Sequence, residues 1–293
     1  CCKEQDVDIV AIQEHRQRSK DTEIEYRYSD DGEWLLGLAS ATEEGNGGVG
    51  LLMKTKYKEL LMNIERVNDR IIVAYFAGNP ALTILSAYAP TDMANDDEKS
   101  EFYDALSDCI KSIPKHNVKL VLADMNAIVG REMSSRTIGS SLYHDKTNDN
   151  GERLIALCEM YDMREIQSRF RHRQGRLWTW RHTSGQTAQL DHILVNSKWR
   201  NSVRNCRAYN TMNVDSDHRV VCCKFKLRLR ATKKCSVTNI RYNYASLKND
   251  RVNERFNKVL ANRFEALQNV RANDQPNLDK EQPSDDDDND DFT

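Results

Sequence analysis

The sequence predicts an α/β fold, and three observations support that prediction. Residues 118–123 form a nearly continuous apolar run, which is typical of a central strand covered on both faces. Residues 95–113 place Phe102, Leu106 and Ile110 on one stripe, as in a helix that packs on a sheet. Polar side chains directly follow several predicted strands. Open α/β sheets bind ligands at strand ends, so the functional residues are expected along one edge of the sheet.

The other elements follow from apolar runs and the turn residues between them. Strands are expected at residues 7–13, 49–53, 70–76, 82–89 and 220–229. The Gly-rich segment 45–48 is a turn leading into the second of these strands. Residues 178–180 and 190–195 are expected to pair as a hairpin, a second helix should open at Asn150, and residues 246–270 should form an amphipathic, charged helix.

Charge is unevenly distributed along the chain. The net charge is −2, but residues 274–293 contain nine of the 45 acidic residues and one of the 43 basic ones. The remainder therefore carries 42 basic and 36 acidic residues. This basic excess suits an anionic partner such as nucleic acid, and a solvated surface of mixed charge explains it equally well. Residues 271–293 have almost no apolar content and are expected to be disordered.

The cysteines and the chain ends indicate a compartment but no chemistry. The eight cysteines form no CxxC pair and no Cys/His cluster at zinc spacing, so they are expected to be buried or incidental thiols. Neither a signal peptide nor a membrane-spanning run is evident. We expect a nuclear or cytoplasmic location and no membrane partner.

Seven side chains at the ends of predicted strands have the residue types needed for phosphoryl chemistry. They are Glu14, Tyr88, Asp124, Asn126, Asp191, Asp217 and His218. Carboxylates with an amide suit Mg²⁺, an Asp beside a His manages protons, and a Tyr can stabilise a developing oxyanion. The set favours metal-assisted attack of water on a phosphodiester. Acyl transfer is disfavoured, because the chain has no GxSxG motif and no Cys beside a plausible base.

Each of these residues also has a structural interpretation. Asp217 and His218 could be a capping Asp and a surface His in a turn before a strand. Asp191 could be a hydrogen-bond acceptor within the predicted hairpin. Tyr88 could be a half-buried strand aromatic, and Arg70 a surface cation. The histidines outside the set, which are His15, His144, His172, His182 and His192, are expected to be ordinary surface or loop residues.

Six motifs, taken in order, resemble those of the endonuclease/exonuclease/phosphatase superfamily. They are Ile12-Gln13-Glu14, Gly47-Gly48-Val49-Gly50-Leu51, Tyr88-Ala89-Pro90, Ala123-Asp124-Met125-Asn126, Leu190-Asp191-His192-Ile193-Leu194 and Ser216-Asp217-His218. Within the superfamily, the chain is most similar to the apurinic-type endonuclease domain of non-LTR (LINE/RTE-like) retrotransposons and to craniofacial development protein 2-like proteins. Trp178-Thr179-Trp180 is similar to the retrotransposon branch in particular.

The resemblance implies a fold and a division of the chain. The fold would be DNase I-like, with two mixed β-sheets packed as a sandwich and flanked by helices. The family's first strand would precede Cys1, so the N-terminal strand is expected to be missing. The catalytic domain would span residues 1–230, a connector with an amphipathic helix residues 231–270, and an acidic disordered tail residues 271–293.

The resemblance also implies a role for each site residue. Mg²⁺, or Mn²⁺ in its place, would be held by Glu14, Asp124, Asn126 and Asp217. Asp124 would also position or deprotonate the attacking water, or protonate the leaving oxygen, while Asn126 would orient that water. His218 would contact the phosphate as imidazolium or act as the base, and Asp191 would hold its ring. Tyr88 would steady the phosphate, helped by Arg16 and more weakly by Arg70. Thr91 stands where many relatives have Asn, which weakens at most one phosphate contact.

The expected activity is Mg²⁺-dependent hydrolysis of phosphodiesters by a DNA-nicking endonuclease of retrotransposon origin. Its partner would be DNA. The four arginines Arg169, Arg171, Arg173 and Arg176 would follow the DNA backbone, or they would simply form a solvated loop. The same fold also hosts phosphatases and RNA-directed nucleases. A further alternative is a catalytically inactive nucleic-acid or chromatin binder whose acidic tail contacts a protein.

Overall fold

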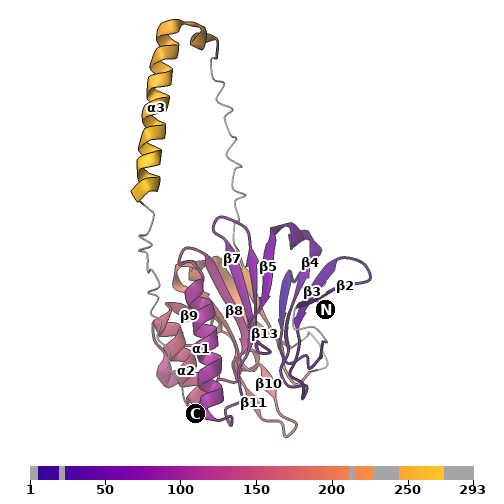
Figure 1. Ribbon diagram of the computed structural model, residues 1–293. Helices are drawn as coiled ribbons and strands as arrows, with labels where there is room; N and C mark the ends of the chain where they lie inside the picture. Colours follow the sequence, from indigo (N-terminus) through magenta and orange to yellow (C-terminus); the bar gives the residue numbers. More distant parts are fainter. Residues whose placement is uncertain (1–5, 20–23, 211–215, 227–243, 274–293) are drawn as a thin grey trace, which may run out of the picture. The chain divides into compact units, whose positions relative to one another are not determined.

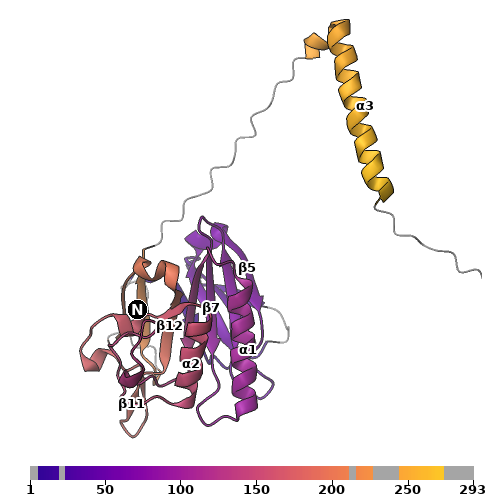
Figure 2. The ribbon, with the colours of Figure 1, turned by 90° about the vertical axis from the view of Figure 1, so that its left-hand side faces the viewer.

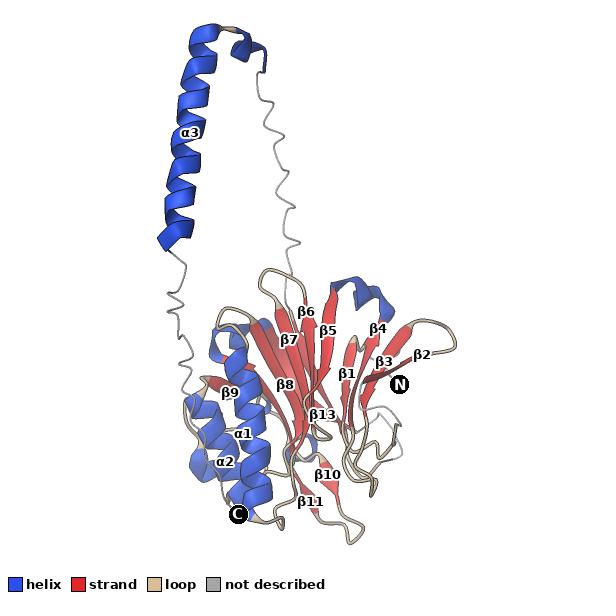
Figure 3. Cartoon of the chain, in the orientation of Figure 1, coloured by secondary structure: helices blue, strands red, loops and turns tan. Residues whose placement is uncertain are grey.

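The centre of the protein is a six-stranded mixed sheet with the strand order β5-β6-β7-β8-β12-β9. The computed structural model describes residues 6–19, 24–210, 216–226 and 244–273. In the sheet, β7 and β8 run parallel and every other neighbouring pair is antiparallel (Figure 3). The strands are β5 (Leu61–Arg66), β6 (Ile71–Phe76), β7 (Leu82–Tyr88), β8 (Val118–Asp124), β12 (Asp191–Asn196) and β9 (Met163–Glu165). As predicted, β8 is a central strand.

Two helices cover one face of this sheet, α1 (Asp96–Ser112) and α2 (Asp149–Met160) (Figure 2). Each begins at an asparagine whose side chain accepts a backbone N–H of the first turn, Asn95 from Glu98 and Asn148 from Gly151. The predicted stripe of α1 is buried: Phe102, Leu106 and Ile110 pack in one core with strand residues of β6, β7 and β8. Both predicted helices are therefore confirmed.

A second β layer covers the opposite face. An antiparallel sheet in the order β1-β4-β3-β2 and the antiparallel pair β13-β14 share a core with the six-stranded sheet. Their bounds are β1 (Ile9–Ile12), β2 (Ile24–Tyr28), β3 (Trp34–Ala39), β4 (Val49–Lys54), β13 (Val203–Tyr209) and β14 (Val220–Phe225). The predicted sandwich of sheets flanked by helices is confirmed. In detail, the second layer is wholly antiparallel, and in the described residues it consists of two separate pieces.

The predicted hairpin between residues 178–180 and 190–195 is wrong. Instead, β10 (Trp180–Arg181) pairs with β11 (Thr187–Ala188), and β12 pairs with β8 and β9. The physical reason is burial: Ile193, Leu194 and Val195 are apolar toward both faces and need cover on both, which only an interior strand receives. The six strands β2, β3, β5, β9, β11 and β13 were not predicted at all.

Shorter elements and free thiols complete this part of the chain. One-turn to two-turn 3₁₀ segments connect the strands: η1 (Thr55–Leu60), η2 (Arg131–Met133), η3 (Gln167–Arg169), η4 (Gln174–Arg176) and η5 (Ser197–Ser202). Among the described cysteines, Cys158 and Cys206 are buried, and all five are free thiols, as expected.

Contacts divide the chain into two compact units, Cys1–Lys233 and Lys234–Thr293. The described part of the second unit is a 3₁₀ segment, η6 (Tyr244–Lys248), and the helix α3 (Asp250–Asn273), coloured orange to yellow in Figure 1. This helix agrees with the amphipathic helix predicted from the sequence, whereas residues 231–243 of the predicted connector and the acidic tail from residue 274 lie outside the described residues. None of the described helices is both long and apolar enough to cross a membrane.

A buried ion pair links β12 to β9, and the expectation that His192 is an ordinary surface or loop residue is wrong. His192 is 1% exposed and Glu165 is completely buried. His192 Nε2 lies 2.9 Å from the carbonyl oxygen of Ala127, which can only accept, so this nitrogen carries a proton. His192 Nδ1 lies 3.4 Å from the Glu165 carboxylate. With acceptors at both ring nitrogens, His192 is best described as an imidazolium.

The environment of Glu165 agrees with this charge assignment. Burial would raise its pKa, but His192 and hydrogen bonds from Ser168 hold it below the usual value. The carboxylate also accepts the backbone N–H groups of Gln167 and Ser168 at 3.2 and 2.8 Å. His192 also bonds Ala127, which follows the predicted site residue Asn126. The Glu165–His192 pair therefore also fixes the segment after β8.

Glu165→Gln removes the negative partner and leaves His192 buried without its counter-charge. We expect the free energy of unfolding to fall by about 3–5 kcal/mol, measured by urea denaturation. The control is Glu25→Gln, which breaks the more exposed Glu25–Arg27 pair and should cost less than about 1 kcal/mol. Equal losses in the two variants would contradict the buried ion pair.

Candidate active site

Three of the predicted site residues stand in one row across three neighbouring strands. Tyr88, the last residue of β7, is directly opposite Asp124, the last residue of β8. Asp124 is in turn opposite Asp191, the first residue of the antiparallel strand β12. The parallel pair and the antiparallel pair therefore bring two strand ends and one strand beginning to the same edge of the sheet.

Alternation along the strands decides which way these side chains point. Ile84, Leu120 and Ile193 belong to the core between the two β layers. Tyr88, Asp124 and Asp191 lie at even spacing from them on the same strands, so they share that face. The row thus lies at the rim of the sandwich, where Asp124 is 5% exposed and the other two are partly exposed.

His218 reaches this row because its segment pairs with the Trp-containing segment. Trp180 and His218 form an isolated antiparallel bridge, Arg181 N donates to Asp217 O at 3.0 Å, and Arg219 N donates to Thr179 O at 2.6 Å. The result places His218 Nδ1 3.0 Å from Asp191 Oδ2, and its Nε2 3.9 Å from Asp124 Oδ2. One imidazole ring therefore stands between two carboxylates.

The charges of these three groups depend on one another. Burial alone would lower the pKa of His218, but the hydrogen bond and charge of Asp191, with Asp124 and Asp217, raise it to about 9. The ring is therefore an imidazolium at neutral pH. Burial, reinforced by the Asp191 charge and opposed by His218, raises the pKa of Asp124. A carboxyl group poised in this way is typical of functional sites.

Glu14 is carried to the same rim by a polar link between the two β layers. The preceding residue, Gln13, donates to Ser86 Oγ at 3.1 Å and to Leu122 O at 3.0 Å. Glu14 itself has a φ of 54°, an uncommon conformation for a residue with a side chain. The Glu14 charge acts on both Asp124 and Tyr88 by raising their pKa values, which places all three in one electrostatic neighbourhood.

Glycines let the chain around Glu14 pack closely. The His15 ring lies against Gly48, where an added Cβ would be 2.6 Å from the ring, and Gly48 has a φ of 85°. His15 Nε2 also bonds the carbonyl of Ala39 at 3.0 Å. His15 lies in a loop, within the expectation of an ordinary surface or loop residue, but its ring is partly buried. It belongs to the packing that holds the Glu14 loop.

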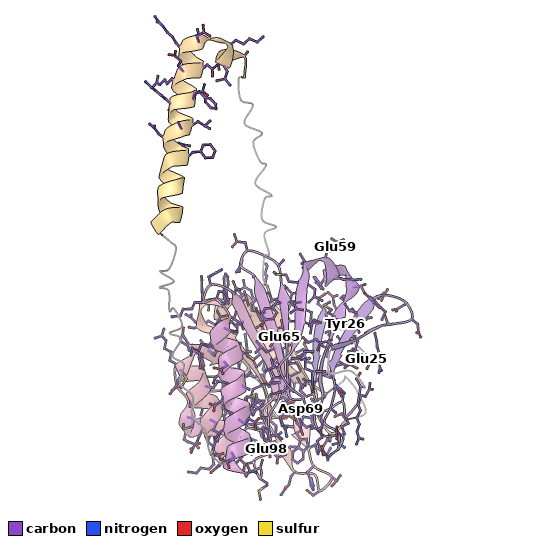
Figure 4. The ribbon with its side chains drawn as sticks, viewed as in Figure 1. Glu25, Tyr26, Glu59, Glu65, Asp69 and Glu98 are labelled. Carbon is purple, nitrogen blue, oxygen red and sulfur yellow. The ribbon has the colours of Figure 1, made fainter. Side chains whose placement is uncertain are left out.

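Arg16 lies beside Glu14 and forms an ion pair with it. The guanidinium also interacts electrostatically with Tyr88 and Asp217, so Arg16 faces the predicted phosphate site. Arg70 is placed differently. Its guanidinium lies over the Tyr88 ring, 5.4 Å from the centroid, and is paired with Glu98 at 2.8 Å. Asp69 is a second acidic neighbour of Arg70. Figure 4 labels Glu98 and Asp69 close to each other, at the lower part of the sheet and α1.

Tyr88 remains protonated in this setting. Burial, together with the charges of Glu14 and Asp124, raises its pKa to about 12. Its hydroxyl can therefore act as a hydrogen-bond donor to a phosphate oxygen. Thr91 lies exposed after β7, and its carbonyl oxygen accepts a hydrogen bond from Ala94 N.

Asn126 follows Asp124 by two residues, and Asp217 directly precedes His218. Asn126 adopts a φ of 46°, donates its side-chain amide to Ala89 O at 2.9 Å, and receives the Asn150 side chain on its carbonyl. Its Oδ1 accepts no hydrogen bond from the described residues. Asp217 is exposed, and its carboxylate accepts the indole N–H of Trp180 at 2.8 Å.

The donor set fits a hard divalent cation. Ligand atoms of Asp124, Asp191 and His218 all lie within 4.8 Å of one another. Of these, His218 is the poorest ligand, because a protonated ring cannot coordinate a metal and Asp191 already occupies its Nδ1. The oxygen donors that remain, with Glu14 on the same rim, match the preference of Mg²⁺. Glu14 and Asp217 are not part of this compact cluster.

Thr179 and Trp180 are site-positioning residues that sequence reasoning missed. The fully buried Thr179 accepts the N–H groups of Leu190 and Asp191 on its hydroxyl at 3.0 and 3.1 Å. Trp180 binds the Asp217 carboxylate, as noted above. The sequence singled out these residues only as part of a Trp-Thr-Trp resemblance. A threonine in a strand-like run carries no local signal that its hydroxyl will hold a neighbouring segment.

The chain is similar to several known proteins. Craniofacial development protein 2 of Bos taurus is 31% identical over 199 residues, covering 66% of this chain and 33% of that protein. The chain thus spans about a third of the length of this curated relative. The AP endonuclease LMAP of Leishmania major superposes with a TM-score of 0.60 and 12% identity, covering 78% of this chain and 80% of that one.

A second solved structure is the endonuclease domain of TRAS1, a telomere-specific non-LTR retrotransposon. It matches with a TM-score of 0.51 and 13% identity, over 78% of this chain and 90% of that domain. At such identities the two structures show a shared fold. The sequence profile of the Endonuclease/Exonuclease/phosphatase family matches residues 2–218. The resemblance read from the six motifs is confirmed, and the chain belongs to the Endonuclease/Exonuclease/phosphatase family.

Proposed function

We propose that the protein hydrolyses phosphodiester bonds of DNA in the presence of Mg²⁺ and acts as a nicking endonuclease. The observation that carries this proposal is the His218 ring held between Asp191 and Asp124 at one rim of the sandwich. A fixed imidazolium beside carboxylates suits an anionic, metal-assisted substrate better than a neutral one. Membership of a family of nucleases and phosphatases supports hydrolysis.

The metal would be held by oxygen donors at this rim. Glu14 and Asp124 are the principal candidates, with the amide oxygen of Asn126 and the carboxylate of Asp217 within the same functional set. Mn²⁺ could replace Mg²⁺, because both accept oxygen ligands. When bound, the cation would supply positive charge to the phosphate oxygens and lower the pKa of Asp124.

The protein's own groups would bind and orient the reactants. Asp191 fixes Nδ1 of His218, so Nε2 is directed toward the site with its proton available to a phosphate oxygen. Asp124 can orient a water molecule and accept its proton, and the Asn126 amide can align that water. The Tyr88 hydroxyl and the Arg16 guanidinium add hydrogen bonds to the phosphate. This is the orienting logic of a catalytic triad applied to phosphoryl transfer.

DNA is the substrate best supported by the comparisons. Among the similar structures are an AP endonuclease, a retrotransposon endonuclease domain and a 3′ phosphatase bound to a product DNA hairpin. We therefore propose a retrotransposon origin and a nuclear or cytoplasmic location, with a protein partner for the acidic tail. The 3′ phosphatase among these similar structures keeps phosphomonoesters as the alternative substrate class.

Nicking of supercoiled plasmid tests the proposal. We expect Mg²⁺-dependent nicking that EDTA abolishes, and a loss of about 10²- to 10⁴-fold in Asp124→Ala or Asp217→Ala, because each removes a group that acts on metal or water. Asp108→Ala removes an exposed carboxylate of α1 and should leave the rate unchanged. A folded protein that nicks no plasmid, with or without Mg²⁺, would leave the binding-module alternative. Release of phosphate from a phosphomonoester instead would identify a phosphatase.

The charge state of His218 gives a second test, in the metal-free protein. Its pKa is raised to about 9, so the ring stays charged below that pH and loses its proton above it. Asp191→Asn removes the carboxylate that raises the pKa of His218 most, whereas the burial that lowers this pKa remains. The pKa of His218 should therefore fall by several tenths of a unit or more. NMR titration of the ring measures this, with exposed His116 as the control. A midpoint unchanged in Asp191→Asn would contradict the assigned hydrogen bond.

In the nicking assay the same variant should move the alkaline limb of the pH–rate profile to lower pH. The reason is that the imidazolium, which binds the phosphate, is lost sooner as pH rises. An unmoved alkaline limb would show that another group limits the rate at high pH.

A further inference from the structure

A cavity of about 340 Å³ is lined mainly by residues with cationic and hydroxyl side chains. Three arginines, Arg131, Arg169 and Arg171, belong to the lining together with His172. The described lining residues include no Asp or Glu. A cavity of this size is at the small end of ligand sites, so it suits a small anion.

The arginines of the cavity are not equally compensated. Arg131 is paired with Asp145 and also donates to Tyr143 O at 3.3 Å, so its side chain is oriented but its charge is balanced. Arg169 makes a long contact of 3.5 Å with Arg136 O, and Arg171 has no hydrogen bond or ion pair with the described part of the chain. Two guanidinium groups therefore remain available to an anion.

The surroundings of Arg169 show that positive charge is concentrated here. Burial and the nearby cations Arg200 and Arg164 lower the pKa of Arg169, with only a partial opposing effect of Glu165. An anion placed between the guanidinium groups would relieve this repulsion. Paired guanidinium donors match the oxygens of a phosphate better than those of a single-point acceptor.

Hydroxyl groups in the same lining complete the donor set. Ser140 and Ser141 line the cavity, and their side chains have no hydrogen-bond partner among the described residues. Ser168 is committed, since its hydroxyl accepts Gly139 N at 2.8 Å and donates to Glu165 O at 3.2 Å. The lining therefore offers two hydroxyl donors together with the two available arginines.

The cavity is joined rigidly to the catalytic row. Ser168 follows Glu165, whose ion pair holds His192 next to Asp191. On the other wall, Leu177 leads directly into the segment of Thr179 that binds Asp191 N. Arg219, next to His218, donates to Gly175 O at 2.8 Å. These contacts connect the lining of the cavity to the segments that carry Asp191 and His218.

We propose that this cavity binds one backbone phosphate of the DNA, separate from the phosphate that is cleaved. The inference rests on the proposed function, because it takes the anion from the same nucleic acid. Free phosphate has the same chemistry, but the fixed link to the catalytic row favours a phosphate that belongs to the bound substrate. The site would hold the strand in register while the scissile phosphate lies at His218.

Arg173 and Arg176 provide matched controls. They lie on the same segment and are exposed, yet neither lines the cavity. If the cavity binds a phosphate, Arg169→Ala and Arg171→Ala must behave differently from Arg173→Ala and Arg176→Ala. If the whole segment acts as a diffuse basic surface, all four variants must behave alike.

The test uses the full chain with EDTA and a series of duplex oligonucleotides, each with one uncharged methylphosphonate in place of a phosphate. The affinity of wild type for the duplex should fall about tenfold when the methylphosphonate stands at one particular position away from the cut site. Arg171→Ala should lose a similar amount with unmodified DNA, and the methylphosphonate at that position should cost it nothing more. The slope of log K against log salt should become shallower by about 0.9. Arg173→Ala and Arg176→Ala should keep the position-specific loss.

The outcomes separate this inference from the proposed activity. A position-specific loss removed by Arg171→Ala supports the cavity site even if no form nicks plasmid, in which case the proposed activity alone fails. Two outcomes overturn the cavity site alone, provided that wild type nicks plasmid. In the first, wild type shows no position-specific loss of affinity; in the second, folded Arg169→Ala and Arg171→Ala both keep that loss. Calorimetry with inorganic phosphate tests the other source: binding that Arg171→Ala abolishes, without any DNA position effect, would assign the cavity to free phosphate and overturn the proposal. Thermal unfolding shows whether each variant is folded.

Discussion

The alignment of Tyr88, Asp124 and Asp191 across three hydrogen-bonded strands is the constraint on which the site depends. Strand register permits no gradual adjustment, because a slip of one residue would turn every side chain of the moved strand to the opposite face. The parallel pairing of β7 with β8 and the antiparallel pairing of β8 with β12 together place the three groups at one rim. His218, Glu14 and Asp217 are then added from segments that belong to other parts of the fold.

Polar contacts buried inside the sandwich transmit this register to the added segments. Gln13 crosses between the β layers to Ser86 and Leu122, and it thereby holds the Glu14 loop. The Glu165–His192 pair holds β9 against β12, and the bond of His192 to Ala127 fixes the segment after β8. Buried polar groups that are fully paired specify one arrangement, because any alternative leaves a charge or donor without a partner. The site is therefore supported by the core itself.

Charge in the unit Cys1–Lys233 is arranged in two regions with different chemistry. The rim concentrates carboxylates around a single imidazolium, which suits a divalent cation and a phosphate together. The neighbouring cavity concentrates guanidinium groups and hydroxyls, which suits a phosphate alone. Because one segment, residues 165–181, contributes to both regions, the spacing between them is set by the fold. A nucleic acid, the substrate proposed above, presents phosphates at regular intervals and would match this pattern.

The sequence by itself determined the α/β class, both helices of the catalytic unit, the strands ending at Tyr88 and Asp124, and the family. Local periodicity and short ordered motifs carry this information, since each depends on residues close together in the chain. Only the tertiary structure decided that β10 pairs with β11, that His192 is a buried imidazolium, and that Thr179 holds Asp191. Each of these depends on hydrogen bonds between residues distant in sequence, whose pairing no local pattern encodes. The same reason explains why the sequence named the groups at the rim but not their order across it.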